Sequence, residues 1–116
     1  MGNVLIIETD GSMYIDSDSA ITLDFLQKQV GGWVEVVALP NESNDTEDVV
    51  LCVNEEGKYS GLAVNKLATE LWVRSYGKTD VIMGNVVITG GTDEEGETLG
   101  LSDAKALDLM KMFVLA

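Results

Sequence analysis

Short blocks of apolar and polar residues along the chain predict strands and amphipathic helices in alternation. Three segments, at about 20–30, 64–76 and 102–114, repeat apolar side chains with the spacing of a helix. The glycines Gly31-Gly32 and Gly77 are expected to end the first two of these helices. Six shorter blocks are typical of strands: Val4 to Glu8, Met13 to Asp16, Trp33 to Leu39, Val49 to Val53, Val81 to Met83 and Val86 to Thr89.

The order of these elements predicts an α+β fold. Two strands precede each of the three helices in turn, which favours a sheet with helices packed on it over alternating parallel units. We therefore expect a single domain over residues 1–116, with a mixed sheet of about six short strands and three helices against one face. The opening order, strand, strand, helix, strand, is like the start of a β-grasp fold.

Small polar residues and glycines mark the predicted turns and helix starts. Ser17-Asp18-Ser19 is expected to cap the first helix, and Ser102 the last. Asn54 to Gly57 predicts a tight turn with Gly57 at a position of positive φ. One short pattern occurs twice, 39 residues apart. The first copy is Glu55-Glu56-Gly57 with Gly61-Leu62, and the second is Glu94-Glu95-Gly96 with Gly100-Leu101. Either a duplication or chance explains the repetition.

Charge restricts the classes of function. Twenty Asp and Glu residues against seven Lys and Arg give a net charge of −13, and the chain has no His. A surface this negative repels nucleic acid and anionic membranes, and it attracts basic partners. The absence of His removes the commonest general base and metal ligand. With 46% hydrophobic residues the composition is nevertheless that of a globular domain.

Other features of the sequence predict a cytoplasmic location. The single cysteine, Cys52, excludes an internal disulfide and favours a reducing compartment. The first residues lack the basic region of a signal peptide, and the apolar runs are far shorter than the roughly 20 residues of a membrane span.

No motif predicts catalysis, a metal site or a cofactor. Asp16 to Ser19 resembles the start of a calcium loop, but Ile21 and Gln27 stand where that loop requires Gly and Glu. Cys52 has no His to activate it, and Gly90-Gly91-Thr92 lacks the Lys of a phosphate loop. The two Glu-Glu pairs at 55–56 and 94–95 would serve as general acid and base only if their turns met. We therefore expect a protein that is not an enzyme.

Many of the acidic residues lie in two segments, 41–56 and 93–97, that contain no Lys or Arg. We predict that the acidic residues of these segments form the partner-binding surface. Exposed turns are common binding sites because a rigid sheet presents them. The last helix is predicted to pack one face into the core, with Ala106, Leu107, Met110, Phe113 and Val114. Met112 and Leu115 project from its other face as a candidate homodimer contact, although a frayed terminus explains these two residues equally well. The predicted partner-binding residues are Glu42, Asp45, Glu47, Asp48, Glu55, Glu56, Asp93, Glu94, Glu95 and Glu97.

Several blocks of the sequence resemble a known family. They are Val30-Gly31-Gly32-Trp33-Val34-Glu35-Val36-Val37, Leu39-Pro40, Val53-Asn54-Glu55-Glu56-Gly57-Lys58, Gly61-Leu62 with Asn65 and Ala68, and Asp80 to Ile88. In order and spacing they are similar to the family called domain of unknown function 3846, over residues 4 to about 100. The resemblance implies a small accessory protein of a bacteriophage, plasmid or related mobile element, acting in the bacterial cytoplasm. It implies no catalytic residue. The 41–48 loop looks like an insertion relative to that pattern.

Three functions remain open on the sequence. The first is a non-enzymatic accessory protein that binds a basic surface of a host or competing-element protein, in anti-defence or host takeover, as a nucleic-acid mimic in one version. The second is a sponge for a small ligand such as a nucleotide signal, assembled at an oligomer interface. Its difficulty is that Arg74 and six Lys are the only cations. The third is a carboxylate-based enzyme.

Overall fold

The computed structural model describes residues 2–40 and 47–114, which form five strands and three helices. The α+β class predicted from the sequence is confirmed. Most boundaries lie within two or three residues of those predicted. In chain order the elements are β1 (Val4–Ile7), β2 (Met13–Asp16), α1 (Leu23–Val30), β3 (Val34–Leu39), β4 (Val49–Asn54), α2 (Lys66–Tyr76), β5 (Val86–Thr89) and α3 (Asp103–Val114).

The described strands form one sheet in the order β2-β1-β5-β4-β3, and every pairing in it is antiparallel. The prediction of a mixed sheet was therefore wrong. The predicted strand at 81–83 was also wrong, since Met83 makes only an isolated bridge with Val64. Gly84, with a φ of 86°, follows that bridge directly, so the chain turns before a ladder can extend. Only Val86 onward enters the sheet, beside β1 and β4.

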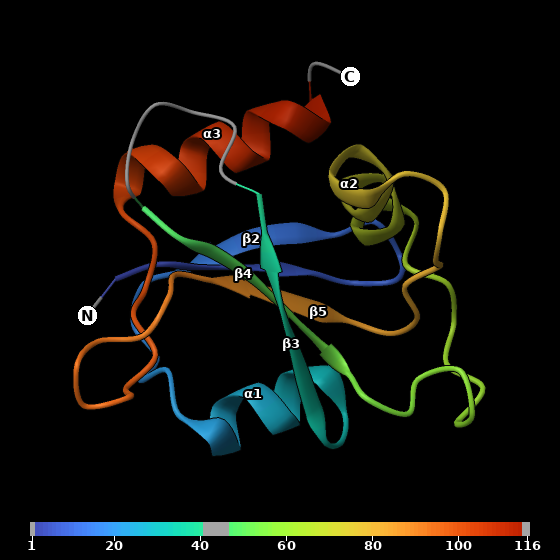
Figure 1. The fold of residues 1–116 in the computed structure, drawn as a ribbon, viewed down its shortest axis with the longest axis horizontal. Helices are drawn as coiled ribbons and strands as arrows, with labels where there is room; N and C mark the ends of the chain where they lie inside the picture. Colours follow the sequence, from blue (N-terminus) through green and yellow to red (C-terminus); the bar gives the residue numbers. More distant parts are fainter. Residues whose placement is uncertain (1, 41–46, 115–116) are drawn as a thin grey trace.

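Helices cover both faces of the sheet, and not one face as predicted (Figure 1). Helices α2 and α3 lie on one face, where alternate residues such as Leu5, Leu51 and Ile88 pack into the larger core. The opposite face of the same strands carries Ile6, Cys52 and Val87, which pack with Leu26 of α1. Side chains of a strand alternate between faces, so strands that are apolar at nearly every position require a cover on each side.

The turn before α1 differs from the prediction. Thr22 caps α1 by accepting a hydrogen bond from the Phe25 backbone, and Gly31 ends the helix at a φ of 82°. Ser17, Asp18 and Ser19 therefore do not cap it. The Asp16 carboxylate instead accepts hydrogen bonds from the backbone N–H groups of Asp18 and Ser19, which closes a turn after β2. These hydrogen bonds hold the pKa of Asp16 below its ordinary value, and the bond from the Ser19 backbone contributes most.

The inner face predicted for α3 was right in part, since Ala106 is buried and Met110 and Phe113 pack against the larger core, while the side chain of Val114 lies outside the described structure. Leu109 and Lys105 are buried as well, whereas Leu107, predicted to be in the core, is 51% exposed. Met112 packs against the larger core and does not project outward. Leu115 lies outside the described residues. Neighbouring residues of a helix are about 100° apart, so a small shift in phase exchanges Leu107 for Leu109 and Lys105 at the border of the buried face.

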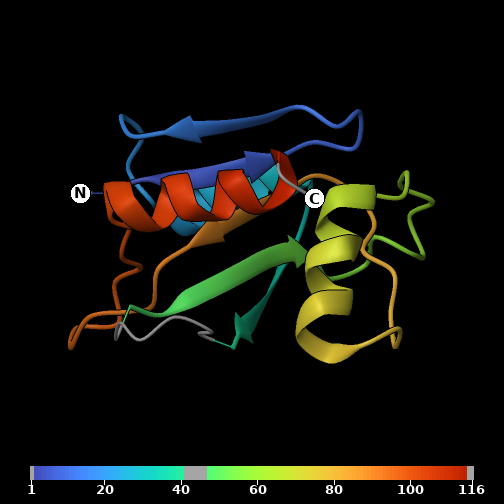
Figure 2. The same ribbon diagram turned by 90° about the horizontal axis from the view of Figure 1, so that it is seen from above.

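The three helices and the sheet fit within about 34 × 32 × 22 Å, with α3 crossing above β1 and β5 and its last turn approaching α2 (Figure 2). Within the ranges 2–40 and 47–114, no helix has the length and apolar character needed to cross a membrane.

Candidate functional site

Acidic residues from separate parts of the chain meet at one end of the sheet, where β4 begins and β5 ends. Glu47 accepts hydrogen bonds from the backbone N–H and the hydroxyl of Ser102, at 2.7 and 2.6 Å, and so caps α3 from a distance. Asp48 lies against the base of the next acidic turn, because a Cβ on Gly91 would be 2.9 Å from its carboxylate oxygen. The positive end of a helix dipole favours carboxylates here. We call this group of residues the acidic end; it consists of Glu47, Asp48, Asp93, Glu94, Glu95, Glu97 and Asp103.

Within the acidic end, the turn at 93–97 is held by one of its own acids. The Asp93 carboxylate accepts hydrogen bonds from the backbone N–H groups of Glu95 and Glu97, both at 2.9 Å. Gly96 takes a φ of 81°, which completes the turn. Glu94, Glu95 and Glu97 are exposed. Asp93 and Glu47 thus have structural roles, and the three glutamates with Asp48 present their carboxylates to solvent.

The second predicted acidic turn has the same Glu-Glu-Gly sequence at the opposite end of the sheet. The Glu55 and Glu56 backbone N–H groups donate to the Trp33 carbonyl and to the Asn54 side chain, while both glutamate side chains are exposed. Gly57 was predicted to need a positive φ and does not have one. Its role is steric, since a Cβ there would lie 3.1 Å from the carbonyl oxygen of Met83.

The two Glu-Glu turns do not meet. Figures 1 and 2 both show the 93–97 turn and the 55–62 segment at opposite ends of the molecule. β4 and β5 are antiparallel, so the segments that follow these two strands leave the sheet at opposite ends. The predicted partner-binding residues that the structure describes therefore form two surfaces and not one, and the pairs Glu55-Glu56 and Glu94-Glu95 do not come together. Glu42 and Asp45 lie outside the described residues.

Other candidate chemistry from the sequence proves structural. Cys52 is 1% exposed, and burial raises the pKa of its thiol to about 11, so the thiol stays protonated near neutral pH. Among residues 2–40 and 47–114, no group of three or more Cys, Asp or Glu side chains is placed to hold a metal ion. Lys58 pairs with Asp80, and this hydrogen bond is the main cause that lowers the pKa of Asp80.

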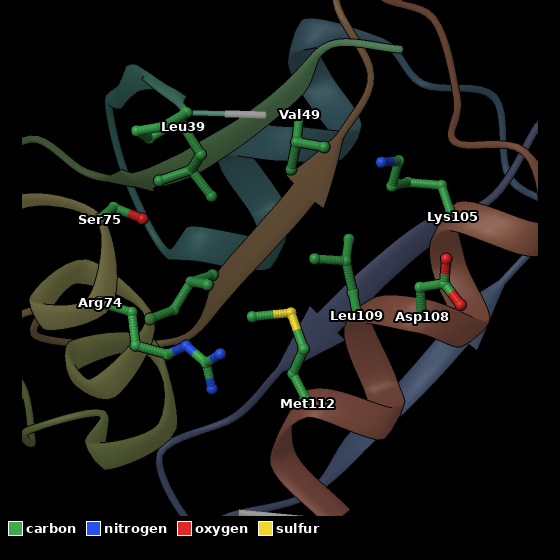
Figure 3. Close-up of a pocket in the computed structure, with 10 residues that line it drawn as sticks. Leu39, Val49, Arg74, Ser75, Lys105, Asp108, Leu109 and Met112 are labelled. Atoms are coloured by element: carbon green, nitrogen blue, oxygen red, sulfur yellow. The ribbon is translucent and has the colours of Figure 1, made fainter. Parts of the chain in front are cut away.

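A cleft between α2 and α3 is the feature that the sequence did not predict (Figure 3). It has a volume of about 250 Å³. Its apolar walls come from three regions of the chain: Leu39 and Val49 from the sheet, Leu71 from α2, and Leu109 and Met112 from α3. We call it the α2–α3 cleft.

The polar groups at the α2–α3 cleft include two cations. Arg74 extends its guanidinium from α2 toward α3, and Lys105, only 7% exposed, projects from α3 near Val49 (Figure 3). Arg74 forms no ion pair with a described residue. Ser75 and Asp108 complete the polar part of the lining. A second hollow of about 430 Å³ shares Arg74 and Met112 with the cleft and adds Lys78 and Phe113.

Three of the chain's seven Lys and Arg residues thus line these two hollows: Arg74, Lys78 and Lys105. No sequence signal links residue 74 to residue 105, because only the packing of α2 and α3 on the same face brings them together. The scarcity of cations was visible in the sequence, but the location of three of them along these two hollows was not.

The whole described fold corresponds to one family. The chain belongs to the family described as domain of unknown function 3846, which matches it over residues 1–114. No curated protein and no solved structure matches the chain.

Proposed function

We propose that this member of the domain of unknown function 3846 family is a non-enzymatic binding protein, and that its acidic end docks on a basic surface of another protein. The setting that we propose is a phage or other mobile element acting inside a bacterial host, where the partner is a host or competitor protein. The observation that supports the proposal is the gathering of two acidic segments, 47–48 and 93–97, beside the start of α3.

The chemistry of the acidic end favours a protein partner with a compact basic patch. Its seven carboxylates come from three segments of the chain, and three of its glutamates are exposed on a turn that Asp93 and Gly96 fix. A fixed turn loses little conformational entropy on binding. Charge at such a surface raises the rate of association and makes it sensitive to salt.

The number of carboxylates at the acidic end limits the version of this proposal in which the protein mimics nucleic acid. Duplex DNA carries one charge per about 1.7 Å, so seven carboxylates correspond to roughly 12 Å of duplex. The molecule spans 34 Å, but Glu55 and Glu56 lie at its other end. The acidic end therefore matches a short basic patch, and mimicry of a long duplex would need a second copy of the chain.

The test is capture from bacterial lysate with a control that the molecule itself provides. Two double variants change the net charge by the same amount at opposite ends of the molecule: Glu94→Lys/Glu95→Lys and Glu55→Lys/Glu56→Lys. We expect a specific protein to bind the parent and the 55/56 variant and to be lost with the 94/95 variant. The purified partner should then associate more slowly as salt increases, and displacement by duplex DNA would identify mimicry. Equal loss with both variants would show that net charge alone causes the binding, and equal retention would place the interface elsewhere.

A further inference from the structure

The edge strand β3 directs part of its backbone away from the sheet. It lies beyond β4 and has six residues, against four in β2, the strand at the other edge (Figure 2). The Trp33 carbonyl accepts a hydrogen bond from the Glu55 N–H at 2.8 Å. Bonded pairs alternate in an antiparallel ladder, so every second residue counted from Trp33 bonds to β4. The residues between them, Val34, Val36 and Ala38, therefore point their N–H and C=O groups outward.

Little in β3 prevents another strand from pairing with these outward groups. Tyr76 donates its hydroxyl to the Ala38 carbonyl, but in the part of the chain that the structure describes nothing bonds to the outward groups of Val34 and Val36. Edge strands that avoid pairing usually carry lysine, proline or a bulge. The one charged residue of β3 is Glu35, and Val36 is 62% exposed. This edge thus offers two donors and two acceptors to an extended segment.

The two sides of β3 present different chemistry to such a segment, because side chains alternate between the faces of a strand. On the face covered by α1, Val36 borders a hollow of about 330 Å³ whose lining includes Leu26 and Val50, and we call it the Val36 hollow. On the face covered by α2 and α3, Glu35 borders a hollow of about 110 Å³ that Glu55 also lines, and we call it the Glu35 hollow.

The charges of the Glu35 hollow favour a cationic occupant. Its one lysine, Lys58, is already paired with Asp80. Glu35 and Glu55 form no ion pair with a described residue. Tyr59, which is 94% exposed, adds an aromatic ring to the lining, and such rings attract cations. A second copy of the chain suits this edge less well, since it carries the same net charge of −13 and is repelled.

We propose that β3 binds an extended cationic segment of another protein, which pairs with Val34 and Val36 as an added strand. The added strand is antiparallel to β3, like every other pairing in the described sheet. Alternate residues of the segment are apolar and lie beside the Val36 hollow, while the residues between them are Lys or Arg and lie beside Glu35. This inference goes beyond the docking at the acidic end, because it uses backbone groups of β3 and other carboxylates.

The probe is the peptide acetyl-Thr-Lys-Val-Lys-Val-Lys-Thr-amide, in which cationic and uncharged residues alternate. Its control, acetyl-Lys-Lys-Thr-Val-Val-Thr-Lys-amide, has the same composition and charge without the alternation. Titration calorimetry on the full chain at low salt should detect binding of the first peptide, and binding of the second should be weaker by at least about 10-fold. The comparison separates strand addition from simple attraction of a cationic peptide to an acidic protein.

Methyl groups on the peptide backbone identify the N–H groups that bond to β3. In an antiparallel strand whose valines lie opposite the outward residues of β3, the valine N–H groups point to β3 and the lysine N–H groups point away. Methylation of both valine backbone nitrogens should therefore abolish binding. Methylation of two lysine backbone nitrogens should change the affinity by less than about threefold, because those N–H groups stay in water.

Variants of the protein test the backbone and the charge separately. Val36→Pro removes an outward N–H without removing a bond to β4, and it should weaken peptide binding by more than about 10-fold. Val36→Thr keeps that N–H and should change the affinity by less than about threefold. Glu35→Lys should weaken binding by about 10-fold. Glu94→Lys makes the same charge change at the acidic end and should have less than about a threefold effect.

Thermal melting verifies that each variant is folded, and if Val36→Pro does not fold, the methylated peptides and Glu35→Lys still decide the question. Three results would overturn the proposal. The first is equal affinity of the parent chain for the alternating and the permuted peptide. The second is an equal loss from the two methylated peptides. The third is a dimer of the parent chain in sedimentation that Val36→Pro converts to a monomer, which would show that a second copy occupies β3.

Discussion

Two segments of the chain share short sequence blocks and the same order of elements, yet they use their glycines in opposite ways. In the first, from β4 to α2, Gly57 is packed against Met83 and Gly61 takes a positive φ of 68° in open space. In the second, from β5 to α3, the corresponding Gly96 has the positive φ and Gly100 the close contact. The same letters at the same spacing thus meet different requirements, because the surroundings come from other parts of the chain.

The helices that follow these segments also begin differently. Asn65, which caps α2, is fully buried, and its side-chain nitrogen donates to the carbonyls of Ile7 and Gly84. Ser102, which caps α3, is exposed and itself donates to Glu47. The first cap therefore joins α2 to the sheet, whereas the second joins α3 to the acidic end.

The largest expected effect tests the two glycines at the end of the shared block. A Cβ on Gly100 would lie 2.5 Å from backbone atoms of Gly2, where Asn3 and Leu101 form a bridge. Gly100→Ala should lower the free energy of unfolding by about 3 kcal/mol, because the backbone cannot move aside cheaply. Gly61→Ala should cost only about 1 kcal/mol, from its positive φ alone. Urea unfolding measures both, and equal losses would contradict the difference drawn between the two segments.

The helix caps provide the second test. Asn65→Ala removes a buried side chain that satisfies two carbonyls and the Ala68 backbone N–H, so we expect a loss of about 3 kcal/mol. Ser102→Ala at the exposed cap should cost about 1 kcal/mol. Thermal and urea unfolding of the two variants against the parent would give these values. If Ser102→Ala proved the more damaging, the attachment of α3 to Glu47 would matter more than the buried cap of α2.

The smallest expected effect concerns charge. With 20 acidic residues against seven cations, screening should raise the melting temperature between low salt and about 0.3 M. At low salt, Glu94→Lys/Glu95→Lys should raise it more than Glu55→Lys/Glu56→Lys, because more carboxylates surround the first pair. Each double substitution should change the free energy of unfolding by less than about 1 kcal/mol, as is usual for exposed charges. Scanning calorimetry at several salt concentrations measures this. A melting temperature that is flat or falls with salt would mean that the acids are already compensated.

The sequence predicted which segments are strands and helices more reliably than how they are arranged. β2 was predicted with the bounds that the structure shows, and Gly31 and Gly77 end helices as expected. Such local signals act within a few residues, through backbone conformation and capping. The core position of Leu107 in α3 and the strand at 81–83 were wrong for a common reason. Both depend on which neighbours the segment meets, as with Leu109 over the sheet and Val64 beside Met83.

The candidate sites show the same division. The acidic character and the exposure of the turns at 55–56 and 94–95 follow from the sequence, since charged residues beside glycines belong at the surface. Their separation follows from the antiparallel pairing of β4 with β5, which no local pattern indicates. The pairing of Glu47 with Ser102 spans 55 residues and was likewise not predicted.

By itself the sequence determined the α+β class, the family, the net charge and the scarcity of cations, because each is a property of composition or of short segments. Only the tertiary structure decided that the sheet is covered on both faces, that the acids form two surfaces, and that Arg74 and Lys105 line one cleft with apolar walls. The physical reason is that burial and electrostatic fields depend on distances through space. Contacts across a sheet or between two helices join residues whose separation along the chain carries no signal of its own.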